Sequence, residues 1–394
     1  MKPIFNSLGS NYNLKFTLSA LTNYLKVSFQ APSSLKNYLE SKFSGTAYLT
    51  YKGRDAIELA LKALNIGSKN SVLTQAFTCY AVEEGITRTG ATPVFVDLAK
   101  NQLNPSIKNL NNAFKTAKNP KAVIIQHTLG YPADIKKIKS WCLKHKLYLI
   151  EDLAQSYGAT DKNNQILGTH ADAIILSFGR DKIIDAISGG AAIIKTKHQH
   201  LPITKKSPRH IAKYEALYPL ITLLIRSTYP VGKLLHLLLK KTQIFASPIT
   251  SPTTTISSIH PAAAALALYQ IKHLDQQLSH RQQISCLYQQ SLKSLSLTTI
   301  TQINRAANLR FPIKVNHPKQ LIGCLQKQNI FISDRWYRAP VDCGSFNLPT
   351  KYQSDSCPNA EKLSSQIINL PTHINISKQK AFRLTKTVQL CLDQ

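Results

Sequence analysis

Short apolar runs alternate with stretches of helical periodicity along the first two hundred residues, and this alternation constrains the fold more than any other feature. The apolar runs include PVFV at 93–96, AVIIQ at 122–126, LYLI at 147–150 and AIILSF at 173–178. Residues 55–64 and 135–145, which lie outside these runs, place apolar side chains at helical spacing. Strands that alternate with helices form a mostly parallel sheet covered on both faces, so we predict an α/β fold. Ligands of such sheets bind beyond the carboxyl ends of the strands.

The length of the chain and a change in its texture indicate more than one domain. Its 394 residues favour two or three domains. Residues 247–258 read SPITSPTTTISS, a composition typical of a loop or linker. A strongly helical stretch begins at Pro261, and residues 309–315 are strand-like. We therefore predict a large domain over residues 1–245 and a smaller C-terminal α/β domain over residues 246–394.

Residues 213–245 differ from the rest of the predicted large domain. They contain two apolar runs, ALYPLITLLI and LLHLLL, with basic residues at the edges and interruptions at Pro219, Pro230 and Gly232. Neither run reaches the roughly 20 residues that a membrane-spanning helix needs. Three interpretations stay open. The segment is a packing surface between domains or subunits, a basic amphipathic patch on a membrane surface, or an ordinary buried helix.

Net charge limits the partners of the chain without identifying them. The formal net charge of +29 predicts attraction to phosphates on a nucleotide, a lipid surface or a nucleic acid. Lysines spread over solvated faces would give the same total. No block of Lys and Arg interleaved with aromatic residues occurs, so we expect no dedicated nucleic-acid domain.

Cysteine spacing and the first thirty residues bear on the compartment. The seven cysteines are scattered, odd in number and without any C-x-x-C pair. This pattern predicts neither a disulfide framework nor a metal site, and it fits a reducing cytoplasm. Residues 16–29 are interrupted by Thr22, Asn23 and Lys26, so we expect no secretion signal.

Lys182 is a candidate catalytic residue because of its surroundings. The segment SFGRDK, residues 177–182, begins at the end of an apolar run, and Gly189 and Gly190 allow a tight return into the next run. Chemistry that uses pyridoxal 5′-phosphate (PLP) needs a lysine amine on a rigid element to hold the cofactor's aldehyde as a Schiff base. Ser177 offers a hydroxyl to the phosphate. A single lysine in so basic a chain is usually solvated, so this interpretation depends on the motifs that follow.

The motif EDLAQ, residues 151–155, comes directly after the run LYLI. A carboxylate at a strand end faces the ligand crevice, where the protonated ring nitrogen of PLP needs a negative partner. Such a partner raises the pKa of a cationic group by about 1–3 units. Asp152 is the candidate partner, and Gln155 is placed to approach the ring hydroxyl. The alternative is that Glu151 and Asp152 only cap the next helix.

Two further segments supply the rest of the predicted cofactor site. Gly53 and Arg54 stand at the start of a helical stretch, where free N–H groups suit a phosphate and a guanidinium can add a bidentate contact. A plain glycine turn capped by Asp55 would give the same pattern. Cys79 or Tyr80 starts another helix and is placed to lie on one face of the ring. Tyr80 has the larger stacking surface, although it also suits a core.

The order and spacing of these motifs resemble the DegT/StrS sugar aminotransferases of fold type I. Other parts of the shared pattern are GATPVFVD at 90–97, PNAE at 358–361 and LP at 370–371. The resemblance covers about residues 45–375. It implies PLP as cofactor, the predicted division into a large domain and a smaller C-terminal one, and a homodimer whose active sites are built from both subunits. It also implies that Lys182 holds the resting imine and moves the proton, and that Asp152 pairs with the ring nitrogen.

Several positions depart from the family pattern. Arg54 replaces the usual hydroxyl residue, and Cys79 stands at the position of the stacking aromatic residue. Ser188 replaces an acid that many members have before the two glycines. The Asn-Tyr-Arg type of segment that a partner subunit usually inserts is not recognisable near residues 253–260. These departures bear on the phosphate site and on the amino donor, whereas the lysine and the aspartate are retained.

The function implied by the resemblance is transfer of an amino group from glutamate to a keto sugar linked to a nucleotide, in surface polysaccharide or lipid-linked glycan synthesis. One alternative is a PLP-dependent sugar dehydratase, but such enzymes usually carry histidine in place of the lysine, and Lys182 argues against it. Another alternative is a PLP-binding regulatory protein without transaminase activity, which docks on a membrane or a partner through residues 213–245.

Overall fold

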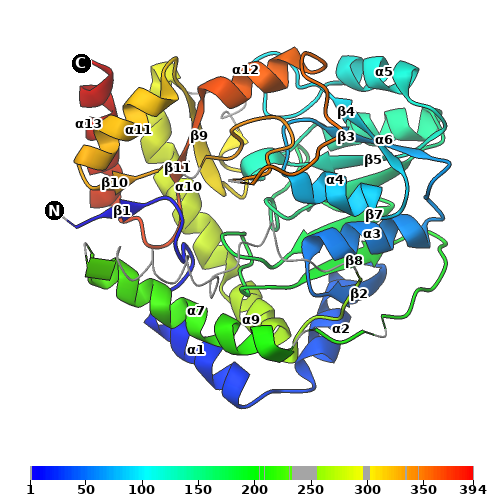
Figure 1. Ribbon diagram of the computed structural model, residues 1–394, viewed down its shortest axis with the longest axis horizontal. Coiled ribbons are helices and arrows are strands. Elements are labelled where there is room, and N and C mark those ends of the chain that lie inside the picture. Colours follow the sequence, from blue (N-terminus) through cyan, green and yellow to red (C-terminus); the bar gives the residue numbers. More distant parts are fainter. Residues whose placement is uncertain are drawn as a thin grey trace.

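A seven-stranded sheet forms the centre of the larger part of the molecule (Figure 1). The computed structural model describes residues 2–203, 205–207, 209–229, 231–232, 255–295, 302–332, 335–344 and 346–393. In spatial order the strands of the sheet are β2 (Thr46–Thr50), β8 (Gly190–Ile194), β7 (Ala173–Ser177), β6 (Tyr148–Asp152), β5 (Pro120–Gln126), β3 (Ser71–Gln75) and β4 (Thr92–Val96). β8 runs antiparallel to both of its neighbours, and all other pairs are parallel. The predicted mostly parallel sheet is confirmed.

Both faces of this sheet are buried, which explains why its strands are continuous apolar runs and do not alternate with polar residues. Successive residues of β5 enter different cores, with Val123 in one and Ile124 in the other. Helices cover both faces (Figure 1). The helices of this part of the molecule are α1 (Leu14–Leu25), α2 (Ala31–Phe43), α3 (Gly53–Ala63), α4 (Tyr80–Thr87), α5 (Ile107–Thr116), α6 (Ile135–Lys144), α7 (Arg209–Ser227) and α9 (Pro261–Lys272), with a 3₁₀ turn, η1, at Thr128–Gly130. Helices α2 to α6 contact strands of the sheet, whereas α1 packs against α7 and α9, and α9 packs against α2.

The two glycines after the Lys182 segment allow the antiparallel return of β8. Gly189 has a φ of +112°, a conformation that other residues rarely adopt. A Cβ atom on Gly190 would lie 2.8 Å from the backbone nitrogen of Gly53, so β8 approaches the start of α3 more closely than a side chain allows. The predicted tight return is confirmed, and it places the end of β7 beside the start of α3.

A smaller group of elements surrounds two short sheets. β9 (Arg310–Lys314) pairs antiparallel with β11 (Ile367–Pro371), and β1 (Ile4–Phe5) pairs parallel with β10 (Ile330–Phe331). The helices of this group are α10 (Leu274–Ser291), α11 (Pro318–Lys327), α12 (Pro358–Gln366) and α13 (Lys378–Leu392), with a 3₁₀ turn, η2, at Lys293–Leu295. The N-terminal strand therefore pairs with the C-terminal part of the chain. The predicted domain boundary at residues 245 and 246 lies outside the described residues and stays a prediction.

The segment 213–245 is described only as far as residue 232. Residues 213–227 of it belong to α7, which packs against α1 and buries Tyr218, Thr222 and Ile225. Leu217 and Leu224, on another side of α7, are exposed. This second, exposed row disfavours the interpretation as an ordinary buried helix. None of the helices within the described ranges has the length and apolar character to cross a membrane.

One pair of cysteines is bonded, contrary to the prediction from their spacing. Cys324 on α11 and Cys391 on α13 form a disulfide across a sequence separation of 67 residues. The packing of α11 against α13 brings the two together, and this contact has no local signature in the sequence. The other five cysteines are free.

Candidate active site

Lys182 lies on the loop that follows β7, at the carboxyl edge of the large sheet. Its main-chain oxygen accepts a hydrogen bond of 2.7 Å from Nδ2 of Asn11. Its Nζ atom lies 4.9 Å from the centre of the Trp336 ring, a contact between a cation and an aromatic face. The loop thus holds the lysine by its backbone and offers its amine to an aromatic residue from the C-terminal part of the chain.

Asp185 fixes the shape of the same loop. Its carboxylate is fully buried and accepts hydrogen bonds from the hydroxyl of Tyr12 at 2.8 Å and from the amides of Asp181 and Ile187 at 2.8 and 3.0 Å. Burial raises the pKa of Asp185 to about 7, and the nearby charge of Asp181 acts in the same direction. The sequence gives no local signal for this residue, because an Asp three positions after a lysine carries no pattern of its own.

Asp152 ends β6, the strand next to the one that leads to Lys182. It is 3% exposed, and Oδ1 accepts a hydrogen bond of 2.9 Å from the amide of Ala154. Burial raises the pKa of this carboxyl above its ordinary value, while the hydrogen bond from Ala154 and the positive charge of Lys182 act in the opposite direction. β6 and β7 are parallel neighbours, so Asp152 at the end of β6 and the Lys182 loop after β7 lie at the same edge of the sheet, as the sequence predicts.

Glu151, the other carboxylate of the EDLAQ motif, has a structural role. Its Oε2 atom lies 3.1 Å from Nε2 of His127 and accepts a hydrogen bond of 2.9 Å from the amide of Gly168. Nδ1 of His127 accepts a hydrogen bond from the amide of Ala133, so Nε2 carries the proton that faces Glu151. Glu151 thus joins a buried network, and the residues after Asp152 form a turn and no helix, so neither carboxylate caps a helix.

Gly53, Ser177 and Gly190 come together as a backbone cradle. A Cβ atom on Gly53 would lie 2.9 Å from Cβ and 3.1 Å from Oγ of Ser177, so only glycine fits there without a shift. Gly53 is the first residue of α3, where amide groups lack helical partners and bind anions. These groups suit a phosphate, and together with Lys182 and Asp152 the donor set fits PLP.

Arg54 points its guanidinium at another residue. Nη1 of Arg54 forms an ion pair with Glu84 of α4. This pair engages one nitrogen of the guanidinium, and the predicted bidentate contact of Arg54 with a phosphate stays a prediction. Sequence spacing gave no sign of the pair, because the two residues lie on neighbouring helices.

Cys79 and Tyr80 stand where α4 begins. Cys79 forms an isolated parallel β-bridge with Asp342, whose main-chain oxygen accepts a hydrogen bond of 3.1 Å from the amide of Tyr80. Burial raises the pKa of the Cys79 thiol, and the charges of Lys182 and Arg54 act in the opposite direction. Cys79 therefore shares the electrostatic surroundings of Lys182. Which of the two residues lies on a cofactor ring stays a prediction.

Gln155 and Tyr337 form a buried contact within the site. Oε1 of Gln155 accepts a hydrogen bond of 2.6 Å from the amide of Leu129, and its Nε2 donates to the hydroxyl of Tyr337. The same hydroxyl accepts from Nε2 of Gln126 at 3.2 Å. Both ends of the Gln155 amide are engaged, so its predicted approach to the ring hydroxyl remains untested. Tyr337 has no local signal in the sequence, because it reaches the site from a distant loop.

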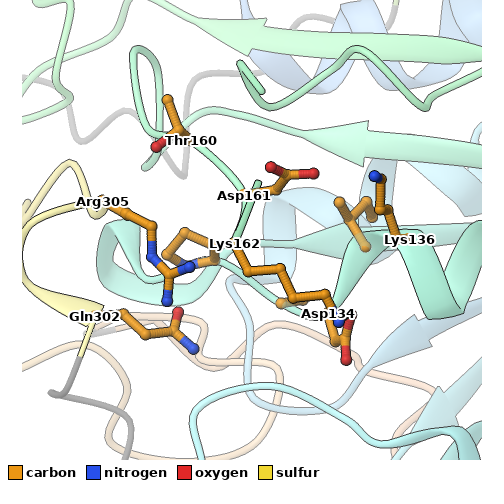
Figure 2. Close-up of a pocket in the computed structure, with 10 residues that line it drawn as sticks. Asp134, Lys136, Thr160, Asp161, Lys162, Gln302 and Arg305 are labelled. Carbon is orange, nitrogen blue, oxygen red and sulfur yellow. Dashed lines mark ion pairs between the residues drawn. The ribbon is translucent and has the colours of Figure 1, made fainter. Parts of the chain in front are cut away.

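A separate pocket outside this site is drawn in Figure 2. Its cavity of about 160 Å³ is lined by Asp134, Asp161, Lys162, Gln302 and Arg305, among others, and none of the predicted site residues belongs to its lining. Asp134 already pairs with Lys162 at 3.3 Å and with a neighbouring lysine of α6. Asp161 binds a histidine. The carboxylates of this pocket are thus engaged within the protein.

Comparison with known sequences decides the family. The sequence model of the DegT/DnrJ/EryC1/StrS aminotransferase family matches residues 33–205 and 253–389. The chain belongs to this family. The match leaves out residues 206–252 between its two parts, and it includes every residue of the predicted site. This confirms the resemblance that the motifs indicated, and with it that the protein is an aminotransferase by family.

Two curated relatives illustrate how far the similarity of this DegT-family chain extends. It is 35% identical over 161 residues to a UDP-N-acetyl-3-dehydro-alpha-D-glucosamine 3-aminotransferase of Acidithiobacillus ferrooxidans, a match that covers 40% of this chain and 43% of the relative. It is 24% identical to the dTDP-4-amino-4,6-dideoxy-D-glucose transaminase of Shigella dysenteriae, over 88% of this chain and 87% of the relative.

The similarity of fold to known structures extends over nearly the whole chain. A putative sugar aminotransferase of Streptococcus pneumoniae, solved in its PLP form, superposes with a TM-score of 0.73 at 18% identity, covering 99% of each chain. At this identity the likeness concerns the fold alone. The predicted fold type I architecture is confirmed.

Proposed function

We propose that this chain is a PLP-dependent aminotransferase that moves an amino group from glutamate to a keto sugar linked to a nucleotide. The observation that supports the proposal is the placement of Asp152 at the end of β6 and of Lys182 on the loop after β7, at one edge of the large sheet. Family membership supports the reaction class. The names of the relatives support a sugar on UDP or dTDP as the class of acceptor.

The roles of the residues follow from their positions. PLP, when bound, accepts the electrons released when a proton leaves the carbon that carries the amino group. The Nζ atom of Lys182 would hold the cofactor covalently and, once released, would take up and return that proton. The carboxylate of Asp152 would keep the ring nitrogen protonated. Gly53 and Ser177, which approach closely at the start of α3 and the end of β7, would hold the phosphate.

The wider setting belongs to the same proposal. A homodimer in the cytoplasm, engaged in the synthesis of surface polysaccharide or lipid-linked glycan, accords with the family pattern and with the five free cysteines. The Cys324–Cys391 disulfide is the feature that disfavours a reducing compartment. The positive net charge of +29 favours a substrate that carries a diphosphate.

A covalent label tests the attachment of the cofactor. Borohydride reduction of the purified protein with PLP is expected to fix the cofactor to the peptide that contains Lys182. Lys52 is the matched control, because burial lowers its pKa to about 8 and makes it a reactive amine beside Gly53. Label on the Lys52 peptide, or none on the Lys182 peptide, would refute the assignment.

The reaction is tested by incubation with glutamate and a panel of nucleotide keto sugars, read by mass spectrometry. We expect an amino sugar product and loss of the product in Lys182→Ala. Conversion of the bound cofactor by glutamate without any sugar product would retain the cofactor assignment and exclude the tested acceptors. The absence of a response to any amino donor would contradict the proposed transfer.

A further inference from the structure

Two neighbouring helices expose rows of large apolar side chains along one edge of the molecule. α1 and α7 lie against each other at this edge (Figure 1). The exposed residues are Leu14, Leu18 and Leu25 on α1, Phe29 beyond its end, Tyr214, Leu217 and Leu224 on α7, and Val231 beyond its end. On each helix the spacing of three, four or seven residues places the row on one side. We call these eight residues the α1–α7 face.

This face is unusual within the described part of the chain. It holds more than half of the large apolar side chains that are exposed there. Leu25 and Phe29 are 82% and 83% exposed, so the described residues leave them almost entirely uncovered. Single exposed leucines are ordinary, but apolar residues gathered on adjacent helices mark an interaction surface.

The opposite side of α7 is firmly anchored, so the exposed row is not a consequence of loose packing. Glu215 of α7 is buried and accepts hydrogen bonds from the hydroxyls of Tyr51 at 2.9 Å and Tyr24 at 3.0 Å. Nη1 of Arg226 donates to the main-chain oxygens of Gly9 and Tyr12. These contacts fix which side of the helix faces solvent, and they turn its single carboxylate inward.

The charge around the α1–α7 face has one sign. No Asp or Glu occurs in residues 1–39, and Glu215 is the single acid in residues 186–274. Lys15 at the start of α1 and Lys26 just after its end are exposed, and Lys205 and Lys206 are exposed shortly before α7. The segments that carry the α1–α7 face therefore combine exposed apolar side chains with exposed lysines, and none of their described carboxylates is exposed.

This combination selects an anionic partner over a second copy of the chain. A symmetric contact between two copies would bring two positive faces together, whereas stable interfaces match opposite potentials. Apolar side chains with a basic surround are the pattern of helices that lie in the interface of an anionic membrane. We propose that the α1–α7 face docks the protein on a membrane surface that contains anionic lipid. The helices lie on this surface and do not cross it. The inference is independent of the sugar chemistry proposed above.

Vesicle flotation of the full chain with PLP tests the proposal. We expect the protein to float with vesicles of phosphatidylcholine mixed with phosphatidylglycerol, and to remain at the bottom with phosphatidylcholine alone. Flotation should decrease as salt is raised, because the attraction to the headgroups is screened. Failure to float with the anionic vesicles would overturn the proposal.

Variants distinguish membrane binding through the α1–α7 face from nonspecific membrane binding. Leu18→Asp combined with Leu224→Asp is expected to weaken vesicle binding by about tenfold or more, since each leucine loses its apolar burial. Lys15→Glu combined with Lys26→Glu should weaken it by about fivefold or more for each lysine. The matched control is Leu143→Asp combined with Leu390→Asp, which changes leucines that are 65% and 55% exposed elsewhere. All of these residues are exposed, so the variants are expected to fold, which circular dichroism checks.

Two results would contradict the assignment of this surface. Equal loss of binding in the control pair would show that the α1–α7 face has no special role. Sedimentation velocity addresses the competing occupant: if Leu18→Asp with Leu224→Asp converts an oligomer of the native protein into monomers, the face is an interface between copies and the membrane proposal is wrong. An unchanged oligomer with lost flotation supports the proposal.

Discussion

Nδ2 of Asn11 donates a hydrogen bond of 2.7 Å to the main-chain oxygen of Lys182, so the N-terminal segment holds the loop of the candidate catalytic lysine. Oδ1 of the same side chain accepts a hydrogen bond of 2.7 Å from Nη2 of Arg281 on α10. Arg281 also donates to Thr372 and to the oxygen of Leu309, next to β9 and β11. One amide thus joins the C-terminal part of the chain to the Lys182 loop.

Asn11→Ala is expected to destabilise the protein and also to change the position of the loop that carries Lys182. The change removes the donor to the Lys182 carbonyl and the acceptor of Nη2 of the buried Arg281, whose Nη1 keeps its bonds to Leu309 and Thr372. The loss costs about 1–3 kcal/mol. Asn375→Ala is the matched control, because Asn375 binds the oxygens of Gly9, Ser10 and Tyr12 in the same segment without touching Lys182. Chemical unfolding and kcat are the measurements. At equal loss of stability Asn11→Ala should lower kcat further, and equal kcat values would show that Asn11 has only a structural role.

Asp152→Asn is expected to lower activity without lowering stability. Loss of the carboxylate should lower the pKa of a cationic ring nitrogen by about 1–3 units, which corresponds to a tenfold to thousandfold loss of the reactive form. Burial already raises the pKa of Asp152, so the folded protein gains nothing from its negative charge at neutral pH. We therefore expect an equal or higher Tm for Asp152→Asn, alongside reduced kcat/KM. A parallel fall of Tm and activity would indicate that the residue acts through the fold.

The strands, and the residues at their ends, were predictable because their signals are local. A buried strand reads as a short apolar run, and Asp152 and Ser177 end two such runs. Parallel neighbours then bring their carboxyl ends to one edge, whatever lies between them in the sequence. The glycines at 53, 189 and 190 were predictable for the same reason, since each permits a local approach of backbone.

The partners of these residues were not predictable, because they depend on packing between distant segments. Tyr337 reaches Gln155 across 182 residues, and Asn11 reaches Lys182 across 171. The direction of Arg54 was missed for a similar reason, since Glu84 lies on a different helix. In each case the side chain alone permits several partners, and only the tertiary arrangement of helices selects one.

Gly53→Ala is expected to weaken cofactor binding by about tenfold or more, since a methyl group misplaced by a few tenths of an ångström in a close-packed site costs of order 1–3 kcal/mol. The added Cβ atom would lie 2.9 Å from Cβ of Ser177, so the end of β7 or the start of α3 must shift. Gly323→Ala is the control, because nothing lies within 4 Å of its Cβ position on α11. That substitution should stabilise the helix by about 1 kcal/mol. Titration of PLP into both variants checks the difference, and equal affinities would exclude a tight phosphate cradle at Gly53.

The Cys324–Cys391 disulfide predicts a defined thiol count and a redox-dependent stability. Of the seven cysteines five are free, so a thiol reagent should detect five groups in unfolded, unreduced protein and seven after reduction. Closing a loop of 67 residues limits the unfolded chain, and its loss should cost about 4 kcal/mol on the chain-entropy account. Cys324→Ser with Cys391→Ser should match the reduced protein in Tm. Seven thiols before reduction would show that the two sulfurs are not joined in solution.

Asp185 predicts a decline of stability as the pH rises from about 4 to 7. Burial raises its pKa in the folded protein to about 7 from the ordinary value of 3.8, with Asp181 acting in the same direction. Between these values the folded chain binds a proton that the unfolded chain releases, so raising the pH favours unfolding by at most about 1.4 kcal/mol per pH unit. Below both values the group has no effect, and above pH 7 the full cost is present. Asp185→Asn keeps an acceptor for Tyr12 but cannot titrate. The difference in unfolding free energy between the two proteins should therefore shift with pH in this window, and a constant difference would mean that Asp185 ionises normally in the fold.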